Sequence, residues 1–184
     1  SKIGDIVKKL KLKHPVIIVG KDCPRKNIWR MDLFDKYKNS REYGENWGGD
    51  AVFKYAHEEE LFKKAGADML VRHPRLEADD CLALTVKNIR GLCPTNKIYI
   101  ITSDMDYLQL ADENTIPINL KFKPLTASNN SFKDKKKDLF CKIVMGDKSD
   151  DIPSIFKKCG IKTASKYYDN PDLFKKKLEE NNAY

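Results

Sequence analysis

Acidic residues gather at four points along this chain of 184 residues, and three of these points adjoin strongly apolar runs. Acids that only solvate a surface are not expected there, so we expect the four groups to build one site. Carboxylate oxygens without an accompanying Cys or His pattern suit hard cations such as Mg²⁺ or Mn²⁺. A group of this size predicts two ions roughly 3.5–4 Å apart, an arrangement that hydrolyses phosphodiesters. The candidate metal ligands are Asp22, Glu77, Asp79, Asp80, Asp104, Asp106, Asp147 and Asp150.

Apolar runs predict the elements that must position these acids. Residues 16–20 and 98–101 read as buried parallel strands, so Asp22 and Asp104 lie just past strand carboxyl ends, where open α/β sheets keep their active sites. This pattern predicts an α/β fold with a central, mostly parallel sheet flanked by helices. The other predicted elements are helices at about 2–11, 78–90 and 106–111, and strands at about 68–71 and 116–120.

Two of the acidic groups have simpler explanations, which stay open. Glu77, Asp79 and Asp80 fall at a predicted helix start, where a carboxylate often caps the first turn. Capping accounts for one acid and hardly for three. Asp106 could likewise cap the helix that follows it, although the buried strand just before Asp104 favours a functional site.

Two stretches depart from the α/β pattern. Residues 29–64 are aromatic and heavily charged, with helical spacing that glycines interrupt at 44–49. Residues 127–137 are polar and are predicted to form a flexible loop.

The segment from residue 143 to residue 164 carries the most specific signal. It reads as a helix, an acidic turn, a short helix, a tight glycine turn and a further helix. The turn at Gly160 can present backbone N–H groups and Lys162 to a phosphate without reading bases. An ordinary αα-hairpin is the alternative, but it would not need Asp147 and Asp150 immediately upstream.

The charge balance points to a polyanionic partner. Lys and Arg outnumber Asp and Glu by 35 to 27, for a net charge of +8. Because eight of the acids are candidate ligands, the remaining surface should be strongly positive toward a phosphate backbone. Background lysine richness is the alternative explanation.

Other residue patterns exclude several classes of site. Five cysteines without a CxxC pair suit a reducing cytosol, and the three histidines lack zinc-binding spacing. No apolar run approaches the 18 residues or so that a membrane-spanning helix needs.

Four motifs in order resemble the flap endonuclease/5′→3′ exonuclease superfamily, in particular its bacteriophage ribonuclease H-type 5′ nucleases. The similarity runs from about residue 15 to residue 168. The motifs are Trp29-Arg30 with Tyr37-Lys38-Asn39-Ser40-Arg41, Glu77-Ala78-Asp79-Asp80, Thr102-Ser103-Asp104-Met105-Asp106, and Met145-Gly146-Asp147-Lys148-Ser149-Asp150-Asp151-Ile152.

The resemblance implies roles for individual residues. One metal ion would be surrounded by Asp22, Glu77, Asp79 and Asp80, and the second by Asp104, Asp106, Asp147 and Asp150. Lys38 and Arg41 match catalytic basic residues of a helical gateway at about 29–64, which contact the scissile phosphate and the 5′ single strand. Arg30, in the same region, is expected to contact DNA. Segment 144–168 matches a helix–three-turn–helix that grips duplex DNA, here through Gly160, Lys162, Thr163 and Lys166, often with bound K⁺.

The resemblance also implies a domain organisation, and the chain departs from the family's sequence pattern in two respects. Residues 1–140 are expected to form the nuclease core, and 141–184 the duplex-binding region. The family's first metal-site Asp, on an upstream strand, has no counterpart here, so we expect the chain to be a fragment without that strand. Ser154 and the pair Lys157-Lys158 stand where glycines are common, which weakens the case for K⁺.

The resulting hypothesis is a metal-dependent, structure-selective 5′ nuclease of DNA replication, repair or recombination. It would act as a 5′–3′ exonuclease or flap endonuclease on DNA with 5′ single-stranded ends or flaps, and on RNA in RNA–DNA hybrids. We expect a monomer in the cytoplasm or with replicating DNA. The alternatives are a junction-binding module that has lost catalysis, a PIN-type ribonuclease, and a receiver domain, which would not account for the long basic insertion.

Overall fold

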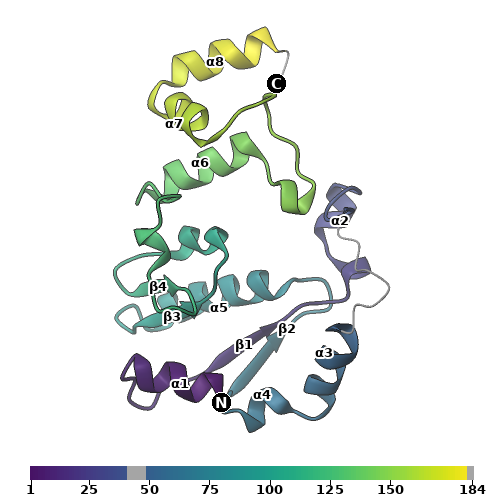
Figure 1. Ribbon diagram of the computed structural model, residues 1–184, viewed down its shortest axis with the longest axis vertical. Helices are drawn as coiled ribbons and strands as arrows, with labels where there is room; N and C mark the ends of the chain where they lie inside the picture. The colour runs from purple at the N-terminus through teal and green to yellow at the C-terminus, as the bar shows by residue number, and fades with distance from the viewer. Residues whose placement is uncertain (41–48, 182–184) are drawn as a thin grey trace. The chain divides into compact units, whose positions relative to one another are not determined.

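The computed structural model describes residues 1–40 and 49–181, and the chain divides into two compact units (Figure 1). The first unit contains residues 1–35 and 49–85 of the described chain, and the second contains residues 36–40 and 86–181. The division falls within helix α5 (Ala78–Leu92), between Thr85 and Val86. Each unit contains one pair of parallel strands and some of the candidate metal ligands.

The first unit is built on two parallel strands. Strands β1 (Ile18–Lys21) and β2 (Met69–Arg72) pair with Ile18 opposite Met69 and Lys21 opposite Arg72, which confirms the strands predicted near 16–20 and 68–71. The β1 side chains are half-buried rather than buried. The other elements of this unit are α1 (Lys2–Lys9), the 3₁₀ helix η1 (Arg25–Asn27), α2 (Arg30–Leu33), α3 (Gly49–Glu58), α4 (Leu61–Lys64) and the first half of α5.

Strand β1 approaches the start of α5 so closely that only glycine fits at position 20. A Cβ atom on Gly20 would lie 2.8 Å from the Ala78 carbonyl oxygen and 2.9 Å from Cγ of Leu82. Two backbone hydrogen bonds fasten the loop after β1 to the residues before α5, from Cys23 N–H to Leu76 O and from Trp29 N–H to Arg75 O, both 3.1 Å long. The end of β1 and the first turn of α5 are thereby held side by side.

The second unit also contains a parallel pair. Strands β3 (Ile98–Ile101) and β4 (Thr115–Ile118) align Ile98 with Thr115. Arg90 of α5 supports this pair, because its guanidinium donates to Thr115 Oγ1 (2.9 Å) and to the Asn114 carbonyl oxygen (2.5 Å). The other elements are the 3₁₀ helices η2 (Met105–Leu110), η3 (Leu125–Ala127) and η4 (Lys148–Asp150), and the helices α6 (Lys135–Met145), α7 (Ile161–Asp169) and α8 (Pro171–Glu180).

A separate apolar core joins α6, α7 and α8. Cys141 and Val144 of α6 are each 1% exposed, and Ala164 of α7 is fully buried. Aromatic rings complete this core, with edge-to-face contacts between Phe140 and Phe174 at 4.9 Å. Such packing gives α7 and α8 a fixed place relative to α6, although the identification of this region as a helix–three-turn–helix stays a prediction.

Three expectations about the fold need correction or refinement. The segment predicted as a helix at 106–111 is the 3₁₀ helix η2, because Asp104 caps it and it ends after six residues. The predicted loop at 127–137 is wrong at its end, because Asp134 accepts hydrogen bonds from Lys136 N–H and Lys137 N–H and starts α6 at Lys135. The α/β class with parallel strands is confirmed, but the described strands pair as two two-stranded sheets.

The expected boundary between residues 140 and 141 falls inside α6. It therefore does not separate elements, and the division into a nuclease core and a duplex-binding region stays a prediction. Among the described helices, none combines the length and the apolar character needed to cross a membrane.

Candidate functional site

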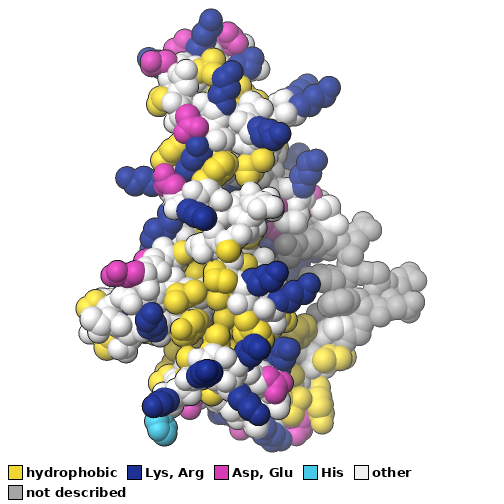
Figure 2. Space-filling view, turned by 60° about the vertical axis from the view of Figure 1, so that its left-hand side comes forward, with side chains coloured by type: hydrophobic (Ala, Val, Ile, Leu, Met, Phe, Trp, Pro, Cys, Tyr) yellow, Lys and Arg dark blue, Asp and Glu magenta, His cyan; other side chains and the backbone are white. Residues whose placement is uncertain are grey.

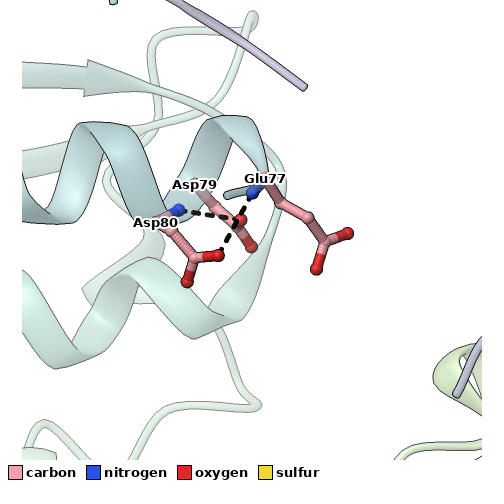
Figure 3. Close-up of side chains that lie close together, drawn as sticks. All are labelled: Glu77, Asp79 and Asp80. Carbon is pink, nitrogen blue, oxygen red and sulfur yellow. Dashed lines mark hydrogen bonds between the residues drawn. The ribbon is translucent and has the colours of Figure 1, made fainter. Parts of the chain in front are cut away.

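The first unit brings three predicted metal ligands together at the start of α5. Oxygens of Glu77, Asp79 and Asp80 lie within 4.8 Å of one another (Figure 3). Asp80 Oδ2 accepts the N–H of Glu77 (3.2 Å), and Asp79 Oδ1 accepts the N–H of Asp80 (2.9 Å). Asp79 and Asp80 therefore accept backbone N–H groups at the first turn, in line with the capping explanation, and all three acids also converge. The positive end of the helix dipole favours their negative charge.

Asp22 adjoins this group from the end of β1. Its Oδ1 accepts the N–H of Ala78 at 2.7 Å, which the close approach at Gly20 makes possible. Glu77 is only 6% exposed, so part of the cluster is shielded from water. Asp22 thus lies beside the first turn of α5, next to the three acids that converge there; its role as a fourth ligand stays a prediction.

Arg30 supplies positive charge to this carboxylate cluster. Its Nη1 and Nη2 atoms each donate to one oxygen of Asp80 at 2.7 Å, and Nη1 lies 3.2 Å from Glu77 Oε2. Trp29 Nε1 donates to Asp80 Oδ2 at 3.3 Å. The sequence predicted Arg30 as a DNA contact, whereas here it binds predicted metal ligands, because several carboxylates near one another need a counter-charge.

The environment separates the pKa values of the two neighbouring aspartates. Burial raises the pKa of Asp79, and the nearby Glu77 carboxylate adds to this effect. Burial also acts to raise the pKa of Asp80, but the hydrogen bonds and charge of Arg30 outweigh it, so the pKa of Asp80 is lowered. Of these two aspartates, Asp79 is therefore the one whose negative charge is disfavoured without a cation.

The second unit joins two predicted ligands through a lysine that sequence reasoning missed. Lys142 Nζ lies 2.6 Å from Asp106 Oδ1 and 2.7 Å from Asp147 Oδ2. Asp104 faces its own helix, since it caps η2 by accepting the N–H of Asp106 at 2.9 Å. Lys142 lies on α6 and Asp147 lies beyond the end of that helix, so their spacing in the sequence alone could not reveal the contact.

Asp147 sits in a closed acidic turn. It forms two backbone hydrogen bonds of 2.8 Å with Ile152, and its Oδ1 accepts the N–H (2.8 Å) and the Oγ–H (2.5 Å) of Ser149. Gly146, with φ of +68°, lets the chain enter this turn, since a Cβ there would collide with the Ile152 carbonyl oxygen. Burial opposes ionisation of Asp147, but the bonds from Lys142 and Ser149 prevail and lower its pKa to about 2.

Residues 36–40 are hydrogen-bonded to the same turn. Lys38 N–H donates to the Asp150 carbonyl oxygen (2.9 Å), and Ser40 N–H donates to Asp151 Oδ2 (2.6 Å). Tyr37 O–H donates to Asp150 Oδ2 at 3.2 Å, and Lys38 Nζ lies 3.9 Å from Asp150 Oδ1 and 4.9 Å from the centroid of the Tyr37 ring. The predicted catalytic Lys38 is therefore held beside a predicted metal ligand, and Asp151 is a contributor that the motif did not single out.

The other predicted DNA contacts lie on or near α7. Gly160 is the N-cap of this helix, and Lys162, Thr163 and Lys166 are exposed on it. Lys162 and Lys166 are four residues apart and share a helix face. Lys and Arg side chains are spread over much of the visible surface, with acidic side chains between them (Figure 2). Arg41, the second predicted catalytic residue, lies outside the described residues.

The carboxylate oxygens that converge at the start of α5 fit a hard divalent ion. The thiols of Cys23 and Cys81 also lie near the α5 cluster, and burial raises the pKa of both. Burial therefore disfavours the thiolate form, which is the form that binds a metal ion. A group of carboxylate oxygens with high negative charge suits a divalent cation.

Comparison with known proteins gives one family match. A family model described as the 5′-3′ exonuclease, N-terminal resolvase-like domain matches residues 1–144. A search of curated proteins finds no match.

Solved structures from bacteriophage T5 share the fold. The T5 5′-exonuclease with divalent zinc ions bound has a TM-score of 0.70 and 19% sequence identity, covering 91% of this chain and 64% of that chain. The T5 flap endonuclease in a pseudo-enzyme-product complex with DNA and metal ions has a TM-score of 0.69 and 18% identity, covering 91% of this chain and 63% of that chain. The present chain thus spans less than two thirds of these relatives, and at this identity the likeness concerns the fold.

Proposed function

Because this chain belongs to the family of 5′-3′ exonuclease N-terminal, resolvase-like domains, we propose that it is a metal-dependent nuclease that hydrolyses phosphodiester bonds of DNA near a 5′ end. The observation that carries this proposal is the convergence of Glu77, Asp79 and Asp80 at the start of α5. The binding of metal ions and of DNA by the T5 relatives supports it.

We propose one divalent ion for each carboxylate set, with Mg²⁺ or Mn²⁺ as the ion. The first set is Asp22, Glu77, Asp79 and Asp80, and the second is Asp104, Asp106, Asp147 and Asp150. When bound, such ions supply Lewis acidity, which makes water nucleophilic near neutral pH and neutralises charge on phosphate oxygens. A K⁺ ion at the turn before α7 completes the proposed set of cations.

The side chains of this protein position the substrate. The ammonium group of Lys38, packed on the Tyr37 ring, would hold a non-bridging phosphate oxygen and stabilise the charge that develops on it. Arg41 is proposed to assist in the same role. The N-terminal end of α7, with Gly160 and Thr163, would bind backbone phosphates through N–H groups, and Lys162 and Lys166 would add charge. Arg30 would reach DNA after exchanging one of its carboxylate partners.

The proposed substrates are DNA molecules with 5′ single-stranded ends or flaps, with RNA–DNA hybrids as a second class. Backbone contacts of the kind available on α7 select shape rather than sequence, which suits replication and repair intermediates. We propose that the protein acts as a monomer inside the cell, on replicating DNA.

The test is cleavage of 5′-labelled flap DNA by the purified chain in Mg²⁺, in Mn²⁺ and in EDTA, beside blunt duplex, RNA–DNA hybrid and single-stranded RNA. Asp79→Asn should lower flap cleavage by about 100-fold or more while DNA affinity changes little. Asp172→Asn, a first-turn acid of α8, is the matched control and should cleave normally.

Each other outcome has a defined meaning. Tight junction binding without cleavage in either metal would replace the proposal by a binding module. A preference for single-stranded RNA would indicate a PIN-type ribonuclease. Equal cleavage by wild type and Asp79→Asn would remove the α5 cluster from the reaction.

A further inference from the structure

Lys142 occupies the position of a cation in the carboxylate set of the second unit. Its ammonium nitrogen lies 2.6 Å from an oxygen of Asp106, on η2, and 2.7 Å from an oxygen of Asp147, at the start of η4. Lys142 itself lies on α6. One ammonium group therefore joins three elements at the point where the sequence motifs predict a divalent ion.

We propose that the divalent ion enters this site by exchange with the Lys142 ammonium, which holds Asp106 and Asp147 together until the ion arrives. This inference rests on the proposed function, because it assigns the two aspartates to a metal site. It goes beyond that function by making Lys142 a positioning residue and by predicting that the metal and the lysine compete for the same oxygens.

The charge and exposure of Lys142 support exchange rather than shared occupancy. Both oxygens that the ammonium contacts are acceptors that a divalent ion needs, and a second cation within a few ångströms would be repelled. The Lys142 side chain is 39% exposed, so its flexible stem can carry the ammonium into solvent without unfolding α6. The paired acids would otherwise repel each other in the metal-free protein.

Another lysine of α6 provides a matched control. Lys137 Nζ lies 2.7 Å from both carboxylate oxygens of Asp169 and 4.9 Å from the centroid of the Phe132 ring. Its side chain is only 16% exposed, and Asp169 is not among the predicted metal ligands. Lys137 thus forms a lysine–aspartate pair on the same helix that a metal ion should leave intact.

The first experiment follows the lysines directly in the wild-type chain. The protein is treated with a limiting amount of acetic anhydride in EDTA and in saturating Mn²⁺, and modification of each lysine is quantified by peptide mass spectrometry. Mn²⁺ should raise modification of Lys142 at least about threefold, because the freed side chain is no longer shielded by two carboxylates. Modification of Lys137 should not change.

The second experiment compares thermal unfolding of wild type, Lys142→Met and Lys137→Met. In EDTA, both variants should unfold a few degrees below wild type. In saturating Mn²⁺ the unfolding temperature of Lys142→Met should come close to that of wild type, because the lysine is displaced in wild type too. The unfolding temperature of Lys137→Met should stay below that of wild type. Calorimetric titration should show tighter Mn²⁺ binding by Lys142→Met, by roughly tenfold, because a competing charge is gone.

Two results would overturn the exchange even if the chain binds metal. One is that Mn²⁺ leaves the modification of Lys142 unchanged. The other is that Lys142→Met unfolds below wild type by the same number of degrees with and without Mn²⁺. Weaker Mn²⁺ binding by Lys142→Met would also overturn it, because the lysine would then assist the ion. Absence of any Mn²⁺ binding by wild type would overturn both this inference and the proposed function. The labelling experiment decides the matter if Lys142→Met fails to fold.

Discussion

Basic side chains offset part of the negative charge of both carboxylate sets, which helps to explain how the acids can lie close together without a metal ion. Arg30 forms a bidentate ion pair with the two oxygens of Asp80, and Lys142 contacts both Asp106 and Asp147. Without such partners, like charges at these distances would repel each other and favour protonation. The pKa values follow this logic, since Asp79, beside Glu77, is raised, whereas Asp80, beside Arg30, is lowered.

Asp147 should make the metal-free protein sensitive to acid. Its pKa of about 2 in the folded chain lies below the value of roughly 3.9 expected for an unfolded Asp. Ionised Asp147 therefore stabilises the fold above about pH 4, and this contribution is lost as the pH falls toward 2. In EDTA, urea unfolding between pH 6 and pH 2 should show a shallower decline of the unfolding free energy for Asp147→Asn than for wild type, with a difference of roughly 1 kcal/mol. Parallel curves would contradict the assignment.

Lys38 should act on the reaction more than on binding. Its ammonium group is held beside Asp150 and the Tyr37 ring, so it can meet a phosphate only near the carboxylate set of the second unit. Lys38→Ala should lower single-turnover cleavage of flap DNA roughly 10- to 100-fold and change the DNA dissociation constant by less than about threefold. Lys36→Ala, an exposed neighbour, is the control and should behave as wild type in both assays. A loss confined to affinity would assign Lys38 to binding alone.

At the scale of elements, the closeness of strand β1 to helix α5 positions the first carboxylate set. Asp22 reaches the N–H of Ala78 only because Gly20 brings the two backbones together. The glycine is required for space, since its Cβ would meet a backbone oxygen at 2.8 Å. Parallel pairing of β1 with β2 then sets where the strand ends.

Gly20→Ala should therefore cost stability and weaken metal binding together. The strand or the helix must shift to admit the methyl group, which should lower the unfolding free energy by roughly 1–3 kcal/mol. Gly91→Ala is the matched control in α5, because a Cβ there meets nothing within 4 Å, and it should be neutral or stabilising by up to about 1 kcal/mol. Urea unfolding and Mn²⁺ titration of both variants would check this. Equal stability of the two variants would show that the approach of β1 to α5 is not tight.

At the scale of the whole molecule, the net charge favours one class of partner through long-range electrostatic attraction, independently of any single contact. The chain carries +8 although many of its acids belong to the two carboxylate sets. The remaining surface therefore attracts a polyanion while each carboxylate set attracts cations. Binding driven in this way should depend on salt and vary little with base sequence.

Lys162 and Lys166 should each contribute one phosphate contact to duplex binding. Replacement of either by Ala should weaken binding to unrelated DNA sequences alike and should reduce the slope of log affinity against log salt by about 1. Lys9→Ala, in the last turn of α1, is the control and should keep the slope. Titration by fluorescence anisotropy at several salt concentrations measures both effects. A changed sequence preference with an unchanged slope would rule out phosphate contacts on α7.

Much of the local structure and the list of candidate ligands followed from the sequence alone. Apolar runs predicted β3 and the parallel class, and helix-start chemistry predicted α5, because these features depend on residues that are neighbours in the chain. The first residues of η2 and α6 were predicted wrongly. Each start depends on which side chain caps the first turn, and the capping residues are Asp104 for η2 and Asp134 for α6.

Contacts between distant residues could be decided only by the tertiary structure. No sequence pattern links Arg30 to Asp80, Ser40 to Asp151, or Lys142 to Asp106, because each pair is brought together by the packing of different elements. The sequence by itself predicted which acids could bind a metal ion. The fold decided which basic groups neutralise them in its absence, since an ion pair depends on distance in space and not on distance along the chain.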